Sequence, residues 1–302
     1  MQGQLRGAGR VGAALALAIA GVIGSVPAVA HGASLLVEAD WVASKLADRH
    51  LVVLHVGSRA SYDKAHIPGA RLISEENVAR PHDMARGDLM LELPEPAVLR
   101  RTLESLGISD DSTIVVYAAG ETPLQSATRI VFTLDYVGLG SQTSLLNGGL
   151  ASWQKAGLAT ATVAPPVVPG RLSERPVVPV VVDAAFVLSL SGRAHHVLVD
   201  ARAPVFYNGT EPTFGKRGHI PKAVNIPFSP IGDGRGRISL PDLKRTFEAA
   251  GIRPGDTIVA YCHVGQQATA VVLAARLLDV PVVLYDGAFQ DWATGNRGAV
   301  EP

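Results

Sequence analysis

The chain has 302 residues, which is enough for two domains of ordinary size, each with its own core. Lys and Arg together number 27 and so do Asp and Glu, so there is no charge excess that would favour nucleic acid or an anionic membrane as a partner. Hydrophobic residues make up 47% and aromatic residues 5%, a globular composition that excludes a disordered chain and a disulfide scaffold.

The first 30 residues have the three parts of a secretory signal peptide. Arg6 and Arg10 form a cationic start, residues 11–23 an apolar run, and Ala28 and Ala30 a small-x-small cleavage site. The run has 13 residues, fewer than the ~20 that span a bilayer, although an uncleaved anchor is the alternative interpretation. We expect residues 1–30 to be removed, the mature chain to begin at His31, and the protein to be periplasmic or secreted, without stable membrane insertion.

The mature chain repeats itself once, at a spacing of about 145 residues. The stretch HLVVLHVGSRASYDKAHIPGARLI in the first half is matched by HHVLVDARAPVFYNGTEPTFGKRGHIPKAVNIP in the second. A strand, loop, helix, strand and Trp-containing segment follow in the same order in both halves. A proline-rich stretch between them indicates an extended linker. We predict a first domain over residues 31–160, a linker over 161–178 and a second domain over 179–302.

Short β-branched runs bounded by turn residues predict strands buried on both faces at residues 51–56, 113–117, 197–200 and 257–261. Helical segments alternate with these strands, at residues 96–106, 124–134, 241–250 and 268–278. The alternation predicts an α/β fold of two tandem domains, each a parallel sheet flanked by helices.

Cys262 is the only cysteine in the chain, and it stands in the stretch YCHVGQQAT between a predicted strand and a predicted helix. This is the carboxyl end of a parallel strand and the start of a helix, where α/β folds place their sites. Gly265 permits unusual dihedral angles, so the loop can turn backbone N–H groups inward as an anion nest. The helix dipole adds positive charge there, and we expect the pKa of the thiol to fall below its usual value of about 8.5.

A buried core cysteine is the alternative, because Cys packs like a small hydrophobic residue. The matching residue of the first half is Ala118, and a core position would accept either residue. An exported chain normally pairs its cysteines, yet a lone one cannot form an internal disulfide. Together with the glycine-bearing loop, this favours Cys262 as a nucleophile.

The Cys262 loop, the segments GHIPKAVNIP and DGAFQDW, and the tandem repeat resemble the rhodanese family, more narrowly its two-domain thiosulfate and 3-mercaptopyruvate sulfurtransferases. The resemblance covers residues 34–298 and implies that only the second domain is catalytic. It also implies that Cys262 takes the outer sulfur of a small anionic donor as a persulfide and passes it to cyanide or another thiophilic acceptor, by ping-pong kinetics.

The resemblance implies substrate-binding residues as well. Arg202 matches the family's Asp-x-Arg motif, in which the arginine faces the anionic end of the donor; an ion pair with Asp200 is the alternative. Counting back from Tyr62 and Tyr207, the first half has His55 and Gly57 at these two positions, so it has lost the arginine as well as the cysteine.

The rest of the predicted substrate site is the loop after the cysteine, His263, Val264, Gly265, Gln266 and Gln267. Thiosulfate-using members often have basic residues at the two positions after the cysteine, so His263 and Val264 leave the choice of donor open. His263 could be cationic near its usual pKa of about 6.5. Gln267 replaces a threonine that is often found there, and its amide could donate a hydrogen bond to the donor.

The HIP turn and the closing aromatic segment recur in both halves. His219 recurs as His66, so we interpret it as a structural hydrogen-bonding residue and not as a catalyst. Trp292 likewise recurs as Trp153, and we expect a scaffold role for both.

Rival functions are a non-catalytic persulfide carrier or sulfur-compound-binding protein and, less favoured, a cysteine phosphatase or arsenate reductase. The phosphatase loop is one residue longer and closes with an arginine that clamps the phosphoryl oxygens, whereas Ala268 stands at that position here. The sequence contains no metal-ligand spacing, phosphate-binding motif or basic nucleic-acid surface. We therefore expect no cofactor, no metal and no nucleic-acid partner, and a monomer, because the duplication already pairs two domains.

Overall fold

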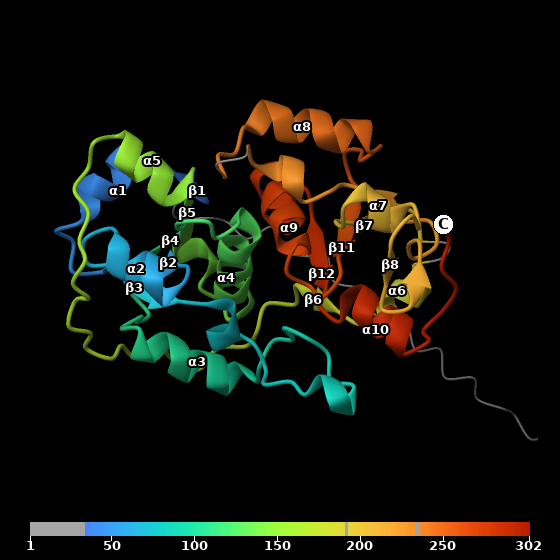
Figure 1. The fold of residues 1–302 in the computed structure, drawn as a ribbon, viewed down its shortest axis with the longest axis horizontal. Coiled ribbons are helices and arrows are strands. Elements are labelled where there is room, and N and C mark those ends of the chain that lie inside the picture. Colours follow the sequence, from blue (N-terminus) through green and yellow to red (C-terminus); the bar gives the residue numbers. More distant parts are fainter. Residues whose placement is uncertain (1–33, 191–192, 234–235) are drawn as a thin grey trace, which may run out of the picture.

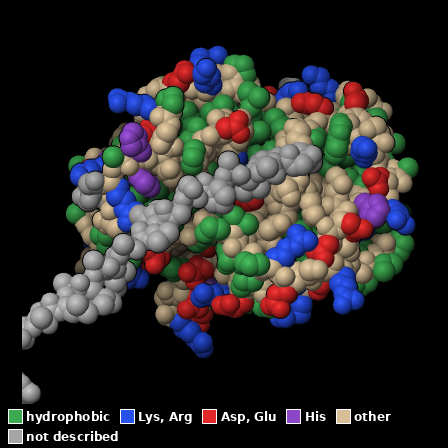
Figure 2. All heavy atoms as spheres, turned by 180° about the vertical axis from the view of Figure 1, so that it is seen from behind, with side chains coloured by type: hydrophobic (Ala, Val, Ile, Leu, Met, Phe, Trp, Pro, Cys, Tyr) green, Lys and Arg blue, Asp and Glu red, His purple; other side chains and the backbone are tan. Residues whose placement is uncertain are grey.

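The computed structural model describes residues 34–190, 193–233 and 236–302, which form two α/β domains side by side (Figure 1). The predicted signal peptide lies outside the described residues. Among the residues that are described, no helix has the length and apolar character needed to cross a membrane. On the uncovered part of the face in Figure 2, acidic and basic side chains are interspersed, as the balanced composition predicts.

The first domain has a five-stranded sheet in the order β1-β5-β4-β2-β3, with every neighbouring pair parallel. Its strands are β1 (Leu36–Val37), β2 (Leu51–Val56), β3 (Arg71–Ile73), β4 (Thr113–Ala118) and β5 (Thr143–Leu146). The helices on its two faces are α1 (Ala39–Lys45), α2 (Arg59–Lys64), α3 (Pro96–Ser105), α4 (Leu124–Tyr136) and α5 (Gly149–Lys155). Three short 3-10 helices, η1 (Glu75–Val78), η2 (Met84–Arg86) and η3 (Gly140–Gln142), complete it.

The second domain repeats this plan in a parallel sheet of order β6-β12-β11-β7-β10. Its strands are β6 (Val181–Val182), β7 (His196–Asp200), β10 (Val224–Asn225), β11 (Thr257–Tyr261) and β12 (Val282–Tyr285). Its helices are α6 (Ala184–Ser189), α7 (Pro204–Tyr207), η4 (Ser229–Ile231), α8 (Leu240–Ala249), α9 (Ala268–Leu277) and α10 (Ala288–Thr294). A small antiparallel hairpin of β8 (Pro212–Thr213) and β9 (Lys216–Arg217) is added before β10.

The predicted strands and helices are confirmed with small shifts at their ends. The strands at residues 51–56 and 257–261 have the predicted bounds, and the four predicted helices begin within one residue of the predicted start. These segments are the long, strongly patterned ones, in which buried apolar faces leave little freedom of register.

Helices α4 and α9 pack against each other in the middle of the molecule and join the two domains (Figure 1). Both helices are buried over most of their length, and one apolar cluster continues from the first domain through both into the second. The hydroxyls of Thr128 and Thr269, which occupy matching positions on the two helices, lie 2.8 Å apart in a hydrogen bond. Because α9 begins directly after the Cys262 loop, this packing brings the first domain against that loop.

Candidate active site at the Cys262 loop

Cys262 lies where the sequence places it, directly after β11 and shortly before α9. Strand β11 is flanked by β7 and β12, so its carboxyl end opens in the interior of the sheet and not at an edge. The side chain of Cys262 is completely buried, and its thiol is free. The position thus combines a free thiol with the end of a parallel strand near a helix start.

The backbone of the loop converges on the sulfur. The N–H groups of Val264, Gly265, Gln267 and Ala268 all donate hydrogen bonds toward the Cys262 sulfur. Gly265 makes the turn possible with φ of +83°, a value that L side chains rarely adopt. The loop is therefore the anion nest that the sequence predicts, built from main-chain donors.

The carboxyl end of β12 packs tightly against this turn. A Cβ atom on Gly265 would lie 2.8 Å from the backbone oxygen of Asp286 and 2.9 Å from its Oδ1 atom. The start of α10 closes the other side, since the N–H of Phe289 donates to the Cys262 carbonyl at 2.9 Å and that of Gln290 to the His263 carbonyl at 3.0 Å. Any side chain at Gly265 would have to displace this backbone.

The expected fall in the thiol pKa is wrong in direction. Burial raises the pKa of the Cys262 thiol, and the four backbone N–H groups oppose this effect without overcoming it. The helix start and the nest favour the thiolate, but desolvation depends on how much of the chain covers the sulfur, which the local sequence does not show. Burial therefore favours the protonated thiol, with the loop N–H groups placed where a thiolate would be stabilised.

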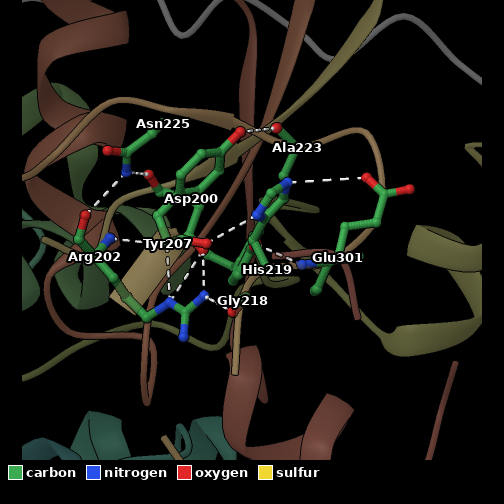
Figure 3. A network of polar contacts seen from close by, with 10 residues as sticks. Asp200, Arg202, Tyr207, Gly218, His219, Ala223, Asn225 and Glu301 are labelled. Carbon is green, nitrogen blue, oxygen red and sulfur yellow. Dashed lines mark hydrogen bonds and ion pairs between the residues drawn. The ribbon is translucent and has the colours of Figure 1, made fainter. Parts of the chain in front are cut away.

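Arg202 forms a buried ion pair with Asp200, as Figure 3 shows. Nε lies 3.0 Å from both Asp200 oxygens, and Nη2 lies 2.6 Å from Oδ2 and 2.8 Å from the Gly218 carbonyl. The guanidinium also stacks on the Phe289 ring, 3.9 Å from its centre. The Arg202 side chain is fully buried, and Nη1 is its one guanidinium nitrogen without a hydrogen bond to a described residue (Figure 3).

His263 is neutral in this site and not the cation that its usual pKa would allow. Burial lowers the pKa of His263 to about 4, and the charge of Arg202 is the second cause of this fall. Its ring meets the Phe206 ring edge to face, with centroids 4.6 Å apart. The position that is often basic in thiosulfate-using members therefore offers no positive charge at neutral pH.

The remaining predicted loop residues differ in where they point. Gln266 turns to the first domain, where its Nε2 donates to Glu75 and, at 3.3 Å, to the Ser126 hydroxyl. Gln267 has its Oε1 atom buried without a hydrogen-bond partner among the described residues. Val264 is half-buried and contributes its backbone N–H. The loop backbone thus faces the sulfur, whereas the Gln266 side chain contacts the first domain.

Sequence reasoning missed Arg129, which reaches the loop from α4 of the first domain. Arg129 is 1% exposed, and its Nη1 lies 2.6 Å from Asp286 Oδ1 and 3.4 Å from the Gly265 carbonyl. Its Nη2 donates to the Leu91 carbonyl. The available signal was an arginine in the middle of a predicted helix, at a position where the second half has Ala270. Asp286 thereby joins the loop to the other domain.

The recurring histidine and tryptophan have structural roles, as expected. His66 and His219 stack on Tyr62 and Tyr207, and the Nδ1 atom of each hydrogen-bonds the carbonyl of the same tyrosine at 2.7 and 2.9 Å. The two tryptophans, Trp153 and Trp292, each donate from Nε1 to a carbonyl six or seven residues further on. Within the described ranges, no group of His, Cys, Asp and Glu side chains has the arrangement of a metal site.

The fold and the loop define a duplicated α/β protein with one intact cysteine site. The rhodanese-like domain family matches this chain twice, over residues 38–156 and 183–294. The chain belongs to the rhodanese family.

Among its relatives is a probable 3-mercaptopyruvate sulfurtransferase of Pseudomonas aeruginosa, 33% identical, with 88% of this chain and 97% of the relative aligned. The 3-mercaptopyruvate sulfurtransferase of Escherichia coli K12 is 30% identical over the same shares of both chains. A thiosulfate sulfurtransferase of Pseudomonas aeruginosa is 28% identical, again over 88% and 97%.

Solved structures agree on the fold. The crystal structure of SseA from Escherichia coli, a 3-mercaptopyruvate sulfotransferase, superposes with a TM-score of 0.74 at 29% identity and covers 85% of this chain and 99% of its own. The anaerobic ergothioneine biosynthesis enzyme from Chlorobium limicola superposes with a TM-score of 0.77 at 21% identity, over 88% of this chain and 70% of its own, and supports the fold alone.

Proposed function

We propose that this protein is a sulfurtransferase that moves a sulfane sulfur from thiosulfate or 3-mercaptopyruvate to cyanide or another thiophilic acceptor through a persulfide on Cys262. The observation that carries the proposal is the convergence of four backbone N–H groups on the only thiol of the chain. The sulfurtransferase names of several relatives with about the same length support it.

In the first half-reaction, the Cys262 thiol loses its proton and the thiolate attacks the outer sulfur of the donor. With thiosulfate, the S–S bond breaks and sulfite leaves with the bonding pair; with 3-mercaptopyruvate, the C–S bond breaks and pyruvate forms once its carbon takes up a proton. The loop N–H groups stabilise the thiolate as it forms, because fixed dipoles in a dry site need no reorganisation.

In the second half-reaction, the acceptor attacks the terminal sulfur of the persulfide. With cyanide, thiocyanate leaves and the electron pair of the S–S bond returns to Cys262 as a thiolate. The same N–H groups face the sulfur in both steps, so one cradle serves donor and acceptor. This double displacement requires ping-pong kinetics.

The donor binds as an anion, and the site meets it mainly with main-chain dipoles. Arg129 and Arg202 lie near the loop, but each is paired with a carboxylate, Asp286 or Asp200. The neutral His263 adds no charge, and Nη1 is the guanidinium nitrogen of Arg202 that makes no hydrogen bond to a described residue. We therefore keep both donors in the proposal and assign the anion contact to the loop N–H groups and to Arg202.

Turnover separates an enzyme from a persulfide carrier. The purified protein is given thiosulfate or 3-mercaptopyruvate with cyanide, and thiocyanate is measured against the amount of protein. The proposal predicts many equivalents of thiocyanate, with parallel lines in double-reciprocal plots. A single equivalent would identify a carrier whose acceptor is a dedicated partner.

We further propose that the protein is exported and acts as a monomer. The proposal of export rests on the first 30 residues of the sequence. N-terminal sequencing of protein recovered outside the cytosol should begin at His31. An N-terminus at Met1 would contradict cleavage, and sedimentation that gives twice the chain mass would contradict the monomer.

A further inference from the structure

The second domain has a cavity on the side of its sheet that faces away from α9. Its volume is about 340 Å³, and α6, the start of β7, the HIP turn, α10 and the tail at residues 298–299 line it. Its apolar wall includes Leu198, Ile220 and Trp292, which belong to the apolar cluster between this face of the sheet and α10. Cys262 belongs to the other cluster, which contains α9, so the cavity is separate from the reaction site.

The charged side chains that line this cavity are all basic in type. They are Arg193, His196 and Lys222, and no carboxylate occurs among the described lining residues. Arg193 uses Nε to hydrogen-bond the Ser189 carbonyl at 3.2 Å and lies over the Phe186 ring, 5.2 Å from its centre. Its two terminal nitrogens make no hydrogen bond to a described residue, and a guanidinium fork of this kind matches a carboxylate.

Lys222 stands in a backbone conformation that favours glycine. It has φ of +66°, and the matching residue of the first domain's HIP turn is Gly69, with φ of +80°. A non-glycine residue in this region is uncommon and costs conformational energy. Its backbone N–H donates to Glu301 at 3.2 Å, whereas its ammonium group forms no ion pair with a described residue. The same turn forms around glycine in the first domain, so the turn itself does not require the lysine side chain.

The other special residues of the cavity are also absent from the first domain. Aligned without gaps, Arg193 corresponds to Asp48, His196 to Leu51, and Leu188 to Ala43. Leu188 is a large apolar side chain that is 51% exposed at the rim. The apolar floor is common to both domains, whereas the basic groups and the Leu188 rim occur only in the copy that carries Cys262.

We propose that this cavity binds a small carboxylate carried on an apolar body, such as a medium-chain or aryl-substituted acid. The apolar body lies against Trp292 and Leu198 under Leu188, and the carboxylate is bound by Arg193 and Lys222. Both contributions are needed: burial of the apolar body supplies affinity, and the two cations select an acid over a neutral molecule of the same shape.

The test uses the full mature chain, with octanoate and 4-phenylbutyrate as probes and 1-octanol as the neutral control, in titration calorimetry. We expect one site per chain and affinity for octanoate at least about tenfold higher than for 1-octanol. Arg193→Asp and Lys222→Gly place the residues of the first domain in the second, and each should weaken octanoate binding at least about tenfold. Lys222→Gly also relieves the backbone, so it should fold normally.

The control is Lys244→Ala on the exposed side of α8, which should bind octanoate like the unmodified chain. Thiocyanate formation should stay unchanged in both cavity variants, because Arg193 and Lys222 lie on the other side of the sheet from Cys262. Equal affinity for octanoate and 1-octanol, no binding of either acid at about 10 mM, or unchanged binding in both variants would overturn the proposal.

Discussion

The two domains have the same strand order and the same loop position, yet only one has the groups for chemistry. The loop after β11 holds Cys262 under converging N–H groups, whereas β4 ends with Ala118, beside a cavity of about 640 Å³. Four of the matched positions that differ are Cys262 and Ala118, Asp200 and His55, Arg202 and Gly57, and Ala270 and Arg129.

The difference between Arg129 and Ala270 runs opposite to the other three, because here the first domain has the charged residue. The first domain lost the cysteine and the Asp-x-Arg pair but has an arginine, Arg129, that reaches across to the Cys262 loop. At the position of Arg129 the second domain has Ala270, which has no polar side chain to send back to the loop after β4. A duplicated domain that has lost its own site thus supports the site of its neighbour.

The largest expected effect comes from exchanging the two residues at the head of the loops. Cys262→Ser should lower thiocyanate formation by at least about 1000-fold, because a hydroxyl does not form a persulfide. Adding Ala118→Cys to this variant should not restore turnover, since His55 and Gly57 stand where Asp200 and Arg202 are needed. Recovery of activity above about a tenth of the original would mean that a cysteine alone is enough to make the first domain active.

The buried ion pair between the domains gives the next effect. Asp286→Asn, which installs the residue of the matching position Asn147, leaves the Arg129 charge buried without its partner. The free energy of unfolding should fall by about 3–5 kcal/mol in urea titrations. The double variant Arg129→Met, Asp286→Asn should recover part of this loss, because it removes the unpaired charge. No recovery would mean that the buried charge of Arg129 is not the cause of the loss.

His55, which replaces the aspartate of the pair, should make stability depend on pH. Burial lowers the pKa of His55 from 6.5 to about 4, so the unfolded chain binds a proton below pH 6.5 that the folded chain does not bind until about pH 4. The contribution of His55 to the free energy of unfolding is therefore fully present above pH 6.5 and is lost as the pH drops toward 4. Between pH 7.5 and 5 the free energy of unfolding should decrease by about 2 kcal/mol from this residue.

The variant His55→Gln isolates this contribution. It should remain folded with a smaller loss of stability between pH 7.5 and 5, measured by urea unfolding at each pH. The pKa of His263 is also lowered to about 4, so His263 still makes the variant less stable in acid. The part of the pH dependence that remains in His55→Gln is therefore expected to come in part from His263. An unchanged pH dependence in His55→Gln would mean that His55 is not held neutral.

The smallest effect is expected at the exposed ion pair between the domains. Arg237 lies 3.0 Å from Glu38, and both side chains are about half exposed. Arg237→Met should change the free energy of unfolding by less than about 1 kcal/mol, since solvent screens exposed pairs. A loss as large as that of Asp286→Asn would show that burial is not the difference between the two pairs.

The sequence predicted what depends on local pattern. Two buried strands have the predicted bounds, and Cys262 lies at the predicted strand end, because alternation of short β-branched runs and helices leaves few other arrangements. It also allowed both roles for Arg202, and the structure shows the ion pair with Asp200 while leaving Nη1 free.

What the sequence could not predict depends on burial and on distant contacts. The direction of the Cys262 and His263 pKa shifts follows from desolvation, which no local pattern measures. Arg129 is 136 residues from Gly265 in the chain, and Gln266 meets Glu75 across the domain interface. These contacts exist only after α4 and α9 have packed.

The most direct test of a single reaction site is the intact mass of the purified mature protein after exposure to thiosulfate and, separately, to 3-mercaptopyruvate. The account predicts a gain of one sulfur atom in the unmodified chain, no gain in Cys262→Ser, and loss of the added sulfur when cyanide is added. An unchanged mass with both donors, or a sulfur retained in Cys262→Ser, would contradict the claim that Cys262 carries the transferred sulfur.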